Sequence, residues 1–523
     1  MDTRKIRRMR GIGTPDSMPM PMPMPMARQF SQAVHVQVPQ QADGKPAVHP
    51  ACASLPARQC HHALVNKTEN DRLARFESSI KRRFDEIVPV LKEVAALGAS
   101  RDFTEQANRL AEQHLGHPFP EGVLERSWIH GVDVPTLYSS SIFSALAAGV
   151  EQFSQRIHQE VADAQSLDAL LVDCGFHAIN VSACADGRLK GLFTYILRLP
   201  ASDLLRYSTF AGTLFDVEDD ILDWQAAELR RFREGYPSTS DSGTRYLKVA
   251  VYHRSSLDPM HQGCAAHQSN EKVAMEAALE RLQQFRHGIE NAFCCGASTD
   301  ILLIGLDTDT DAIRIHVPDG QGDLSLFRSV DNAELYKKTL GMNADQARLA
   351  IYEAIANASD VGGWGQGDGK PHDGMRRLIA NLLINNLSQI EYVVENFGGW
   401  YPDRGHGERF MSIGDGFQEL QVRNLSYYAH LDTVEEGAAD LDVGVKIFRH
   451  LNVEQGLPIP MAINYRYDAN VPGHRERIII KLQRVAAAIQ ARYSDLLSEG
   501  MLYLHGSVQN QKLGSPLEEV PLT

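Results

Sequence analysis

The sequence lacks long hydrophobic runs and any excess of positive charge. No apolar stretch approaches the roughly 20 residues that span a bilayer, and the basic N-terminus has no apolar segment typical of a secretory signal. The formal net charge of −14 argues against a nucleic-acid-binding protein and against attachment to an anionic membrane surface. We therefore expect a protein with no nucleic-acid partner and no membrane association.

Cysteine is also scarce, and no CxxC pair is present. An odd, sparse set of this kind is typical of a reducing compartment, where cysteines bind metal, take part in catalysis or pack in a core. The seven cysteines are Cys52, Cys60, Cys174, Cys184, Cys264, Cys294 and Cys295.

The 523 residues are too many for one hydrophobic core and predict about three domains. Residues 1–54 are expected to be a disordered, basic, Met/Pro-rich arm, because Pro at every second position of Met18–Met26 excludes both helix and sheet. The arm carries seven Lys/Arg against three Asp, so its charge of about +4 opposes that of the whole chain. It is either a solvated tail or a segment that docks an acidic partner.

Residues 55–150 are predicted to form a helical domain. Apolar residues recur at steps of three and four over 68–98, and Thr68 with Asp71 resembles a capping box at the start of that helix. Further helices are expected at about 103–115, 121–129 and 136–166.

Residues 151–405 are predicted to form an α/β (α+β) domain with a central sheet. Apolar β-rich runs alternate with helical patterns, which is typical of a sheet covered by helices. The expected strands are 169–175, 177–186, 246–253, 300–307 and 312–318, and the expected helical stretches are about 270–290 and 333–396.

Residues 406–523 look like a degenerate copy of this domain. VAVYHR at Val249–Arg254 resembles MAINYR at Met461–Arg466, and each is followed by a loop, a long helix and a further apolar strand. VSACADGRL has a loose counterpart in MSIGDGFQEL at Met411–Leu420. Tyr465 stands where His253 is, and no cysteine matches Cys184 or Cys264, so the second copy is expected to have lost its site.

Three groups at predicted strand ends form a candidate zinc site. Cys184 ends one strand, His253 ends the next, and Cys264 lies in the following loop. The carboxyl edge of a sheet is where α/β proteins place reacting groups. Two thiolates and one imidazole leave a fourth zinc position open, which is typical of a catalytic zinc. His261 has HxxC spacing to Cys264 and is the alternative to His253 as the third ligand.

Asp186 and Arg188 follow Cys184 at alternate positions in CADGR. Residues two apart in a strand or tight turn point the same way, so Asp186 is expected to face whatever Cys184 binds. A carboxylate held ionised by a bidentate arginine can accept the hydrogen bond of a zinc-bound hydroxide and orient it. Asp186 and Arg188 are therefore the predicted catalytic residues.

These residues carry a family resemblance. CxDxR followed by His and Cys resembles the β-class carbonic anhydrases, and the segments 173–192, 264–267, 294–318, 382–395 and 423–436 resemble the divergent carboxysomal shell-associated carbonic anhydrases over roughly residues 55–520.

The resemblance implies a lyase (carbonate dehydratase) with one Zn²⁺ per chain that hydrates CO2 reversibly to bicarbonate. It also implies a location in the carboxysome, a bacterial microcompartment, where the enzyme supplies CO2 to Rubisco. The implied partners are shell proteins or Rubisco through the N-terminal arm, and a second copy of the chain in a homodimer or higher oligomer.

Other functions stay open at this point. The chain could be a carboxysome scaffold or adaptor with a vestigial zinc site, or a zinc hydrolase or redox-sensing thiol protein. The intact CxDxR, His and Cys set argues against the first, and the lack of a Glu base and of CxxC argues against the others. Among lesser features, the acidic DTDTD at Asp307–Asp311 is expected to be a hairpin turn, and Cys52–His62 could bind metal but shows no second ligand pair. His177 and His267 are candidate proton relays.

Overall fold

The computed structural model describes residues 61–97, 101–120, 122–125, 131–160, 167–199, 204–235, 245–293, 299–360, 370–512 and 514–522. The arm predicted at 1–54 lies outside the described residues, as do Cys52, Cys60, Cys294 and Cys295. Among the described residues, no helix combines the length and the apolar character needed to cross a membrane.

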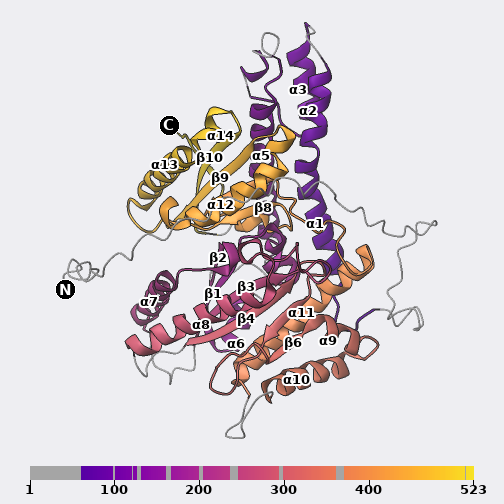
Figure 1. The fold of residues 1–523 in the computed structure, drawn as a ribbon, viewed down its shortest axis with the longest axis vertical. Helices are drawn as coiled ribbons and strands as arrows, with labels where there is room; N and C mark the ends of the chain where they lie inside the picture. Colours follow the sequence, from indigo (N-terminus) through magenta and orange to yellow (C-terminus); the bar gives the residue numbers. More distant parts are fainter. Residues whose placement is uncertain are drawn as a thin grey trace, which may run out of the picture. The chain divides into compact units, whose positions relative to one another are not determined.

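The N-terminal part is helical, as predicted (Figure 1). Its longer helices are α1 (Lys67–Asp85), α2 (Ile87–Ala96), α3 (Phe103–His114) and α5 (Val134–Glu160). Their buried apolar faces form one core that continues onto the five-stranded sheet through residues such as Phe410 and Ala462. The helix expected at 121–129 lies mostly outside the described residues.

The single helix expected at 68–98 is in fact two helices. Pro89 explains the break, since its ring cannot donate a backbone hydrogen bond and would clash with the carbonyl four residues earlier. The predicted cap was also wrong: Asn66 caps α1, and its side chain accepts a hydrogen bond from the backbone of Glu69.

The central domain contains a six-stranded sheet, sheet A, with strand order β2-β1-β3-β4-β5-β6. Its strands are β1 (Phe176–Cys184), β2 (Leu205–Phe210), β3 (Arg245–Arg254), β4 (Thr299–Asp307), β5 (Ile313–His316) and β6 (Ser329–Asp331). The first four pair in parallel and the last two pair antiparallel. Every residue of β4 is buried, which explains why its sequence is a nearly continuous apolar run.

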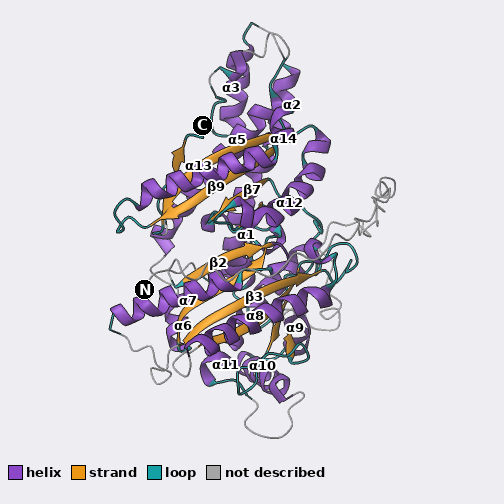
Figure 2. Ribbon diagram, turned by 60° about the vertical axis from the view of Figure 1, so that its left-hand side comes forward, coloured by secondary structure: helices purple, strands orange, loops and turns teal. Residues whose placement is uncertain are grey.

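Helices cover both faces of sheet A, which confirms the predicted layer architecture (Figure 2). One face packs on α7 (Val217–Arg233) and α8 (Glu271–Phe293). The other face packs on a group that contains α6 (Leu167–Asp173), α9 (Asn332–Thr339), α10 (Ala344–Asp360) and α11 (Asp373–Phe397). The strand expected at 169–175 was wrong, because Leu167 and Leu171 lie one helical turn apart and both are buried by α6.

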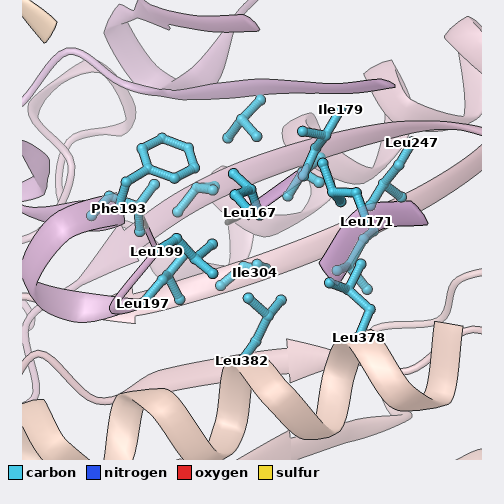
Figure 3. A pocket seen from close by; sticks show the side chains of 15 residues that line it. Leu167, Leu171, Ile179, Phe193, Leu197, Leu199, Leu247, Ile304, Leu378 and Leu382 are labelled. Carbon is cyan, nitrogen blue, oxygen red and sulfur yellow. The ribbon is translucent and has the colours of Figure 1, made fainter. Parts of the chain in front are cut away.

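A small apolar cavity lies between sheet A and α11 (Figure 3). Its volume is about 20 Å³, and it is lined by Leu, Ile, Val and Phe side chains, among them Val251 of β3 and Leu382 of α11. A cavity without polar groups stays dry, so it is part of the core. None of the predicted site residues lines it.

The C-terminal part contains a second sheet, sheet B, with strand order β11-β10-β9-β7-β8. Its elements are β7 (Phe410–Gly414), β8 (Ser426–Ala429), α12 (Val434–Leu451), β9 (Ile459–Tyr467), α13 (His474–Arg492), α14 (Ser494–Ser498), β10 (Leu502–Asn510) and β11 (Glu518–Val520). The order β8-β7-β9-β10-β11 repeats β2-β1-β3-β4-β5, including three parallel pairs and a final antiparallel pair. Helices α12 and α13 occupy the chain positions of α7 and α8.

Candidate metal centre

The three predicted metal ligands come from two neighbouring strands and one loop. Cys184 is the last residue of β1, and His253 is the last but one of β3, which pairs with β1 in parallel. Parallel pairing brings both side chains to the carboxyl edge of sheet A. Cys264 precedes the short 3₁₀ helix η7 (Ala265–His267), so the loop after β3 returns to the same edge.

The structure brings these three side chains together. One ligand atom from each lies within 4.8 Å of the others, and all three residues are buried. The sulfur atoms of Cys184 and Cys264 are 3.8 Å apart, and both cysteines are free thiols. Two sulfurs bound at about 2.3 Å to one tetrahedral zinc ion would be roughly that far apart, so the spacing suits a shared ion.

The polar groups of the cluster also fit a metal ion. His253 is 1 % exposed, yet within the described part of the chain neither of its ring nitrogens has a hydrogen-bond partner. A buried imidazole without partners is costly unless something else, such as a metal ion, satisfies it.

The sulfur atoms of Cys184 and Cys264 lie within hydrogen-bond distance of each other. Their mutual hydrogen bond and burial raise the pKa of Cys184 well above its usual value, whereas the hydrogen bond from Cys184 lowers the pKa of Cys264. A bound metal ion would favour the thiolate form of both cysteines.

His261, the alternative ligand, lies apart from the cluster. Its side chain is exposed, and its Nδ1 lies 2.8 Å from Oδ1 of Asp258. The loop between His253 and Cys264 therefore carries His261 into solvent, and the geometry favours His253.

Asp186 and Arg188 form a bidentate ion pair next to the cluster. The Nε and Nη2 atoms of Arg188 donate to Oδ1 and Oδ2 of Asp186 at 3.0 and 2.7 Å. Asp186 also caps the short helix η3 (Gly187–Leu189) by accepting a bond from the backbone of Arg188. Its Oδ2 lies 3.6 Å from Nε2 of His253. Burial opposes ionisation, but the charge and the hydrogen bonds of Arg188 outweigh it and hold the pKa of Asp186 well below its usual value.

Sequence reasoning missed the groups that hold Arg188. Its Nη1 donates to the carbonyl oxygens of Gln262 and Arg404 at 2.8 and 3.0 Å, and to the hydroxyl of Thr308 at 3.3 Å. Arg188 is thus fully buried with its donors satisfied from three separate segments. Two of the acceptors are backbone carbonyls, which leave no signal in a sequence.

Glu408 was also missed. Its buried carboxylate accepts a hydrogen bond from the backbone of Gly187 at 3.0 Å, and it pairs with Nδ1 of His406 at the same distance. A side chain at position 187 would begin 2.5 Å from Glu408, so only glycine fits there. Burial would lower the pKa of His406, but Glu408 and Asp186 raise it to about 9.

Several lesser candidates lie elsewhere. His177 pairs with Glu228, and Nε2 of His267 lies 2.9 Å from the carbonyl of Gly212, so each predicted relay ring already has a polar partner. Cys174 is buried, as expected for a packing thiol.

The acidic DTDTD segment forms the β4–β5 hairpin, as predicted, but its carboxylates are buried rather than exposed. Asp311 accepts hydrogen bonds from Gln389 and Tyr401, and burial raises its pKa to about 6.

Among the described residues, no cluster of cysteine and histidine lies at the corresponding edge of sheet B, where other residues stand at the positions of Cys184 and His253. Ala183 pairs with Val251 in sheet A, and Ile413 pairs with Ile463 in sheet B. Alignment of VAVYHR with MAINYR therefore puts one residue further, Gly414, at the position of Cys184.

The same alignment places Tyr465 at the position of His253 and Gln418 at that of Arg188. A side chain at Gly414 would begin 2.9 Å from the ring of Tyr465. The tyrosine ring thus fills the space that the first ligand occupies in sheet A.

Family models match most of the chain in three consecutive pieces. The models describe the N-terminal, catalytic and C-terminal domains of the carboxysome shell carbonic anhydrase, and they match residues 62–154, 166–406 and 407–523 respectively. The proposed ligands and the Asp186–Arg188 pair all fall within the catalytic match.

Individual relatives agree with this result. The chain is 53 % identical over 474 residues to the carboxysome shell carbonic anhydrase of Halothiobacillus neapolitanus, covering 90 % of this chain and 92 % of the relative. It is 46 % identical over 476 residues to the protein of that name from Parasynechococcus marenigrum, covering 90 % and 80 %. The chain belongs to the carboxysome shell carbonic anhydrase family.

Proposed function

We propose that this chain is a zinc-dependent carbonic anhydrase that interconverts CO2 and bicarbonate through the centre at Cys184, His253 and Cys264. The observation that carries the proposal is the buried Cys–His–Cys cluster beside the Asp186–Arg188 pair, within the segment that matches the catalytic domain model. Zinc held there would lower the pKa of a water molecule from 15.7 to about 7 and so supply a nucleophile for CO2 at neutral pH.

The residues of the chain would do the orienting. Asp186 stays ionised because Arg188 holds both of its oxygens, so it can accept the hydrogen bond of the attacking water. A carboxylate fixed in this way aligns the nucleophile with a small linear substrate. The water adds to the carbon of CO2, one proton leaves, and bicarbonate is released.

The biological setting follows from the family. The proposed location is the carboxysome, where bicarbonate dehydration would supply CO2 to Rubisco. The basic arm at 1–54 is the proposed docking segment for shell proteins or Rubisco, and a homodimer is the proposed minimal assembly. The proposed domains are 55–150, 151–405 and 406–523. The three family models support this division, because they meet at similar points of the chain.

The test is stopped-flow CO2 hydration by the purified full-length protein, with zinc content measured on the same sample. We expect one catalytic zinc per chain, and loss of both zinc and activity in Cys184→Ser. Cys174→Ala is the matched control, since Cys174 is also a buried free thiol but lies outside the cluster. A Cys184→Ser protein that still hydrates CO2 would contradict the assignment, and a zinc-loaded parent without activity would favour the scaffold function.

A further inference from the structure

A second set of side chains that could hold a metal ion involves residues far in the sequence from Cys184, His253 and Cys264. His61, Glu391 and Glu395 each place one ligand atom within 4.8 Å of the others. The Nδ1 atom of His61 is 2.9 Å from Oε1 of Glu395 and 3.4 Å from Oε1 of Glu391. Glu391 and Glu395 are four residues apart on α11, so their side chains share one helix face. In the sequence, a metal site at Cys52–His62 had no second pair of ligands. Helix α11 supplies such a pair for His61.

Glu391 is held with one oxygen directed at His61. Its side chain is 1 % exposed, and its Oε2 accepts hydrogen bonds from the backbone of His62 at 2.7 Å and from the hydroxyl of Tyr336 at 3.2 Å. Within the described residues, Oε1 has no hydrogen-bond donor. A buried carboxylate oxygen without a donor is costly, and a cation beside it would remove that cost.

The neighbouring His62 fixes the position of His61. The ring of His62 is buried, stacks on Tyr336, and its Nε2 lies 2.8 Å from the hydroxyl of Thr339. This ring and the backbone bond to Glu391 attach the segment to α9 and α11, so His61 meets the two carboxylates from a constrained backbone.

Lys67 is the competing cation. Its ammonium lies 3.0 Å from Oε1 of Glu395 and 3.1 Å from Nε2 of His61. The side chain is half exposed, so the ammonium can move into water at little cost when another cation binds. If no metal binds, Lys67 makes the cluster an ordinary ion-pair network.

We propose that His61, Glu391 and Glu395 bind a divalent transition-metal ion at a second site, with Zn²⁺ as the test ion. One imidazole and two carboxylates are a recognised zinc ligand set, and three protein ligands leave a position for water. Ligand atoms about 2.0 to 2.1 Å from a tetrahedral ion are roughly 3.4 Å apart, close to the two distances from His61. The ion would clamp the chain at His61 onto α11. This proposal stands on its own geometry and does not depend on the catalytic centre.

The experiment measures metal in the full-length holoenzyme after equilibration with micromolar Zn²⁺ and gel filtration. We expect two zinc ions per chain in the parent and one in Glu395→Gln. Glu395 is partly exposed, so this substitution is expected to leave the fold intact. Glu454→Gln is the matched control, because Glu454 also pairs with a histidine, His450, but has no second carboxylate in the cluster. That variant is expected to keep two zinc ions.

Two further variants separate this site from the catalytic one. Cys184→Ser is expected to lose only the catalytic zinc, and the double variant with Glu395→Gln both. In cobalt-substituted protein, the sulfur-to-cobalt absorption is expected to disappear with Cys184→Ser and to persist in Glu395→Gln. Lys67→Met removes the competing ammonium, and calorimetry is expected to show at least about threefold tighter zinc binding at the second site.

The outcomes that overturn the proposal are equally clear. A parent with one zinc per chain, whose zinc is unaffected by Glu395→Gln and Lys67→Met, would mean that the cluster is an ion-pair network only. A second zinc that persists in Glu395→Gln would place that ion elsewhere on the chain.

Discussion

Sheet A and sheet B repeat the same strand order, yet among the described residues only sheet A carries a Cys–His–Cys cluster that could hold a metal ion. In sheet B, Tyr465 replaces His253, its hydroxyl donates to the carbonyl of Leu431 at 2.9 Å, and its ring lies against Gly414. One aromatic side chain therefore fills the edge where sheet A gathers its ligands. This backbone arrangement is therefore stable without the Cys–His–Cys cluster.

The C-terminal part also contacts the turn at 185–188, which holds Asp186 and Arg188. The backbone of Asn424 donates to the carbonyl of Gly187 at 2.9 Å, and that of Tyr428 donates to Ala185 at 3.2 Å. Together with Glu408, these bonds satisfy the backbone on both sides of Asp186. The domain of sheet B thus helps to hold the turn that follows Cys184 in sheet A.

The largest loss of activity is expected when His253, which Tyr465 replaces in sheet B, is removed. His253→Ala is expected to lose its zinc and on the order of 10⁴-fold of the CO2 hydration rate, because water without the metal keeps its high pKa. Zinc analysis and stopped-flow rates on one preparation measure both.

Tyr465→Phe is the matched change in sheet B. It removes one buried hydrogen bond and is expected to cost about 1 kcal/mol of unfolding free energy while zinc and activity stay at parent levels. A His253→Ala protein with stoichiometric zinc would contradict the assignment of His253 as a ligand and make His261 the ligand to test next.

The second prediction concerns Arg188 and its counterpart Gln418. Arg188→Lys keeps the charge but cannot hold both oxygens of Asp186 while bonding Gln262 and Arg404. We expect kcat/KM to fall about 100-fold with zinc content unchanged. Gln418→Lys is expected to leave kcat/KM unchanged. An Arg188→Lys rate within twofold of the parent would show that the bidentate contact of Arg188 does not orient Asp186.

The core strands and the ligands were accessible from the sequence for physical reasons. β1, β3 and β4 are almost wholly buried, so each is rich in apolar residues, although β1 and β3 also carry buried polar side chains such as Ser182 and Lys248. The proposed ligands Cys184 and His253 lie at the ends of two of these strands, and the ends of parallel strands meet at one edge of the sheet. A short apolar run does not by itself distinguish a strand from a helix. The strand predicted at 169–175 is part of a helix, in which Leu167 and Leu171 are buried one turn apart.

The supporting residues could not be predicted in this way. Glu408 is more than 200 residues from Gly187 in the chain, and its role is to accept one backbone hydrogen bond. His61 and Glu391 are likewise brought together only by the packing of the chain on α11. No local pattern marks such partners, because tertiary contacts alone decide which side chain meets which backbone group.

The third prediction compares how the stability of the protein depends on pH after substitutions in two hairpins, the one after β4 and the one after β10. Burial raises the folded-state pKa of Asp311 to about 6, above the roughly 3.9 of an unfolded aspartate. Ionisation therefore destabilises the folded state as pH rises between these values, and the cost is absent below them.

Asp311→Asn removes this cost, and Tyr401 and Gln389 can still donate to its amide oxygen. We expect the variant to be about 2 kcal/mol more stable than the parent at pH 7.5 and no more stable near pH 4, measured by urea unfolding. Lys512→Gln, in the exposed hairpin after β10, is expected to change stability little at either pH. A stability difference independent of pH would show that Asp311 is ionised without cost.

The smallest effect is expected at Glu408, which lies where the second copy meets the catalytic turn. Glu408→Gln keeps an acceptor for Gly187 but removes the buried charge beside His406. We expect kcat to fall about tenfold, the zinc content to stay constant and the pKa of His406 to drop from about 9 in an NMR titration. Glu419→Gln is the control, because Glu419 is a buried carboxylate that pairs with Arg466 inside the second copy. It is expected to lower stability and leave kcat unchanged, so equal loss of kcat in both variants would mean that Glu408 only supports the fold.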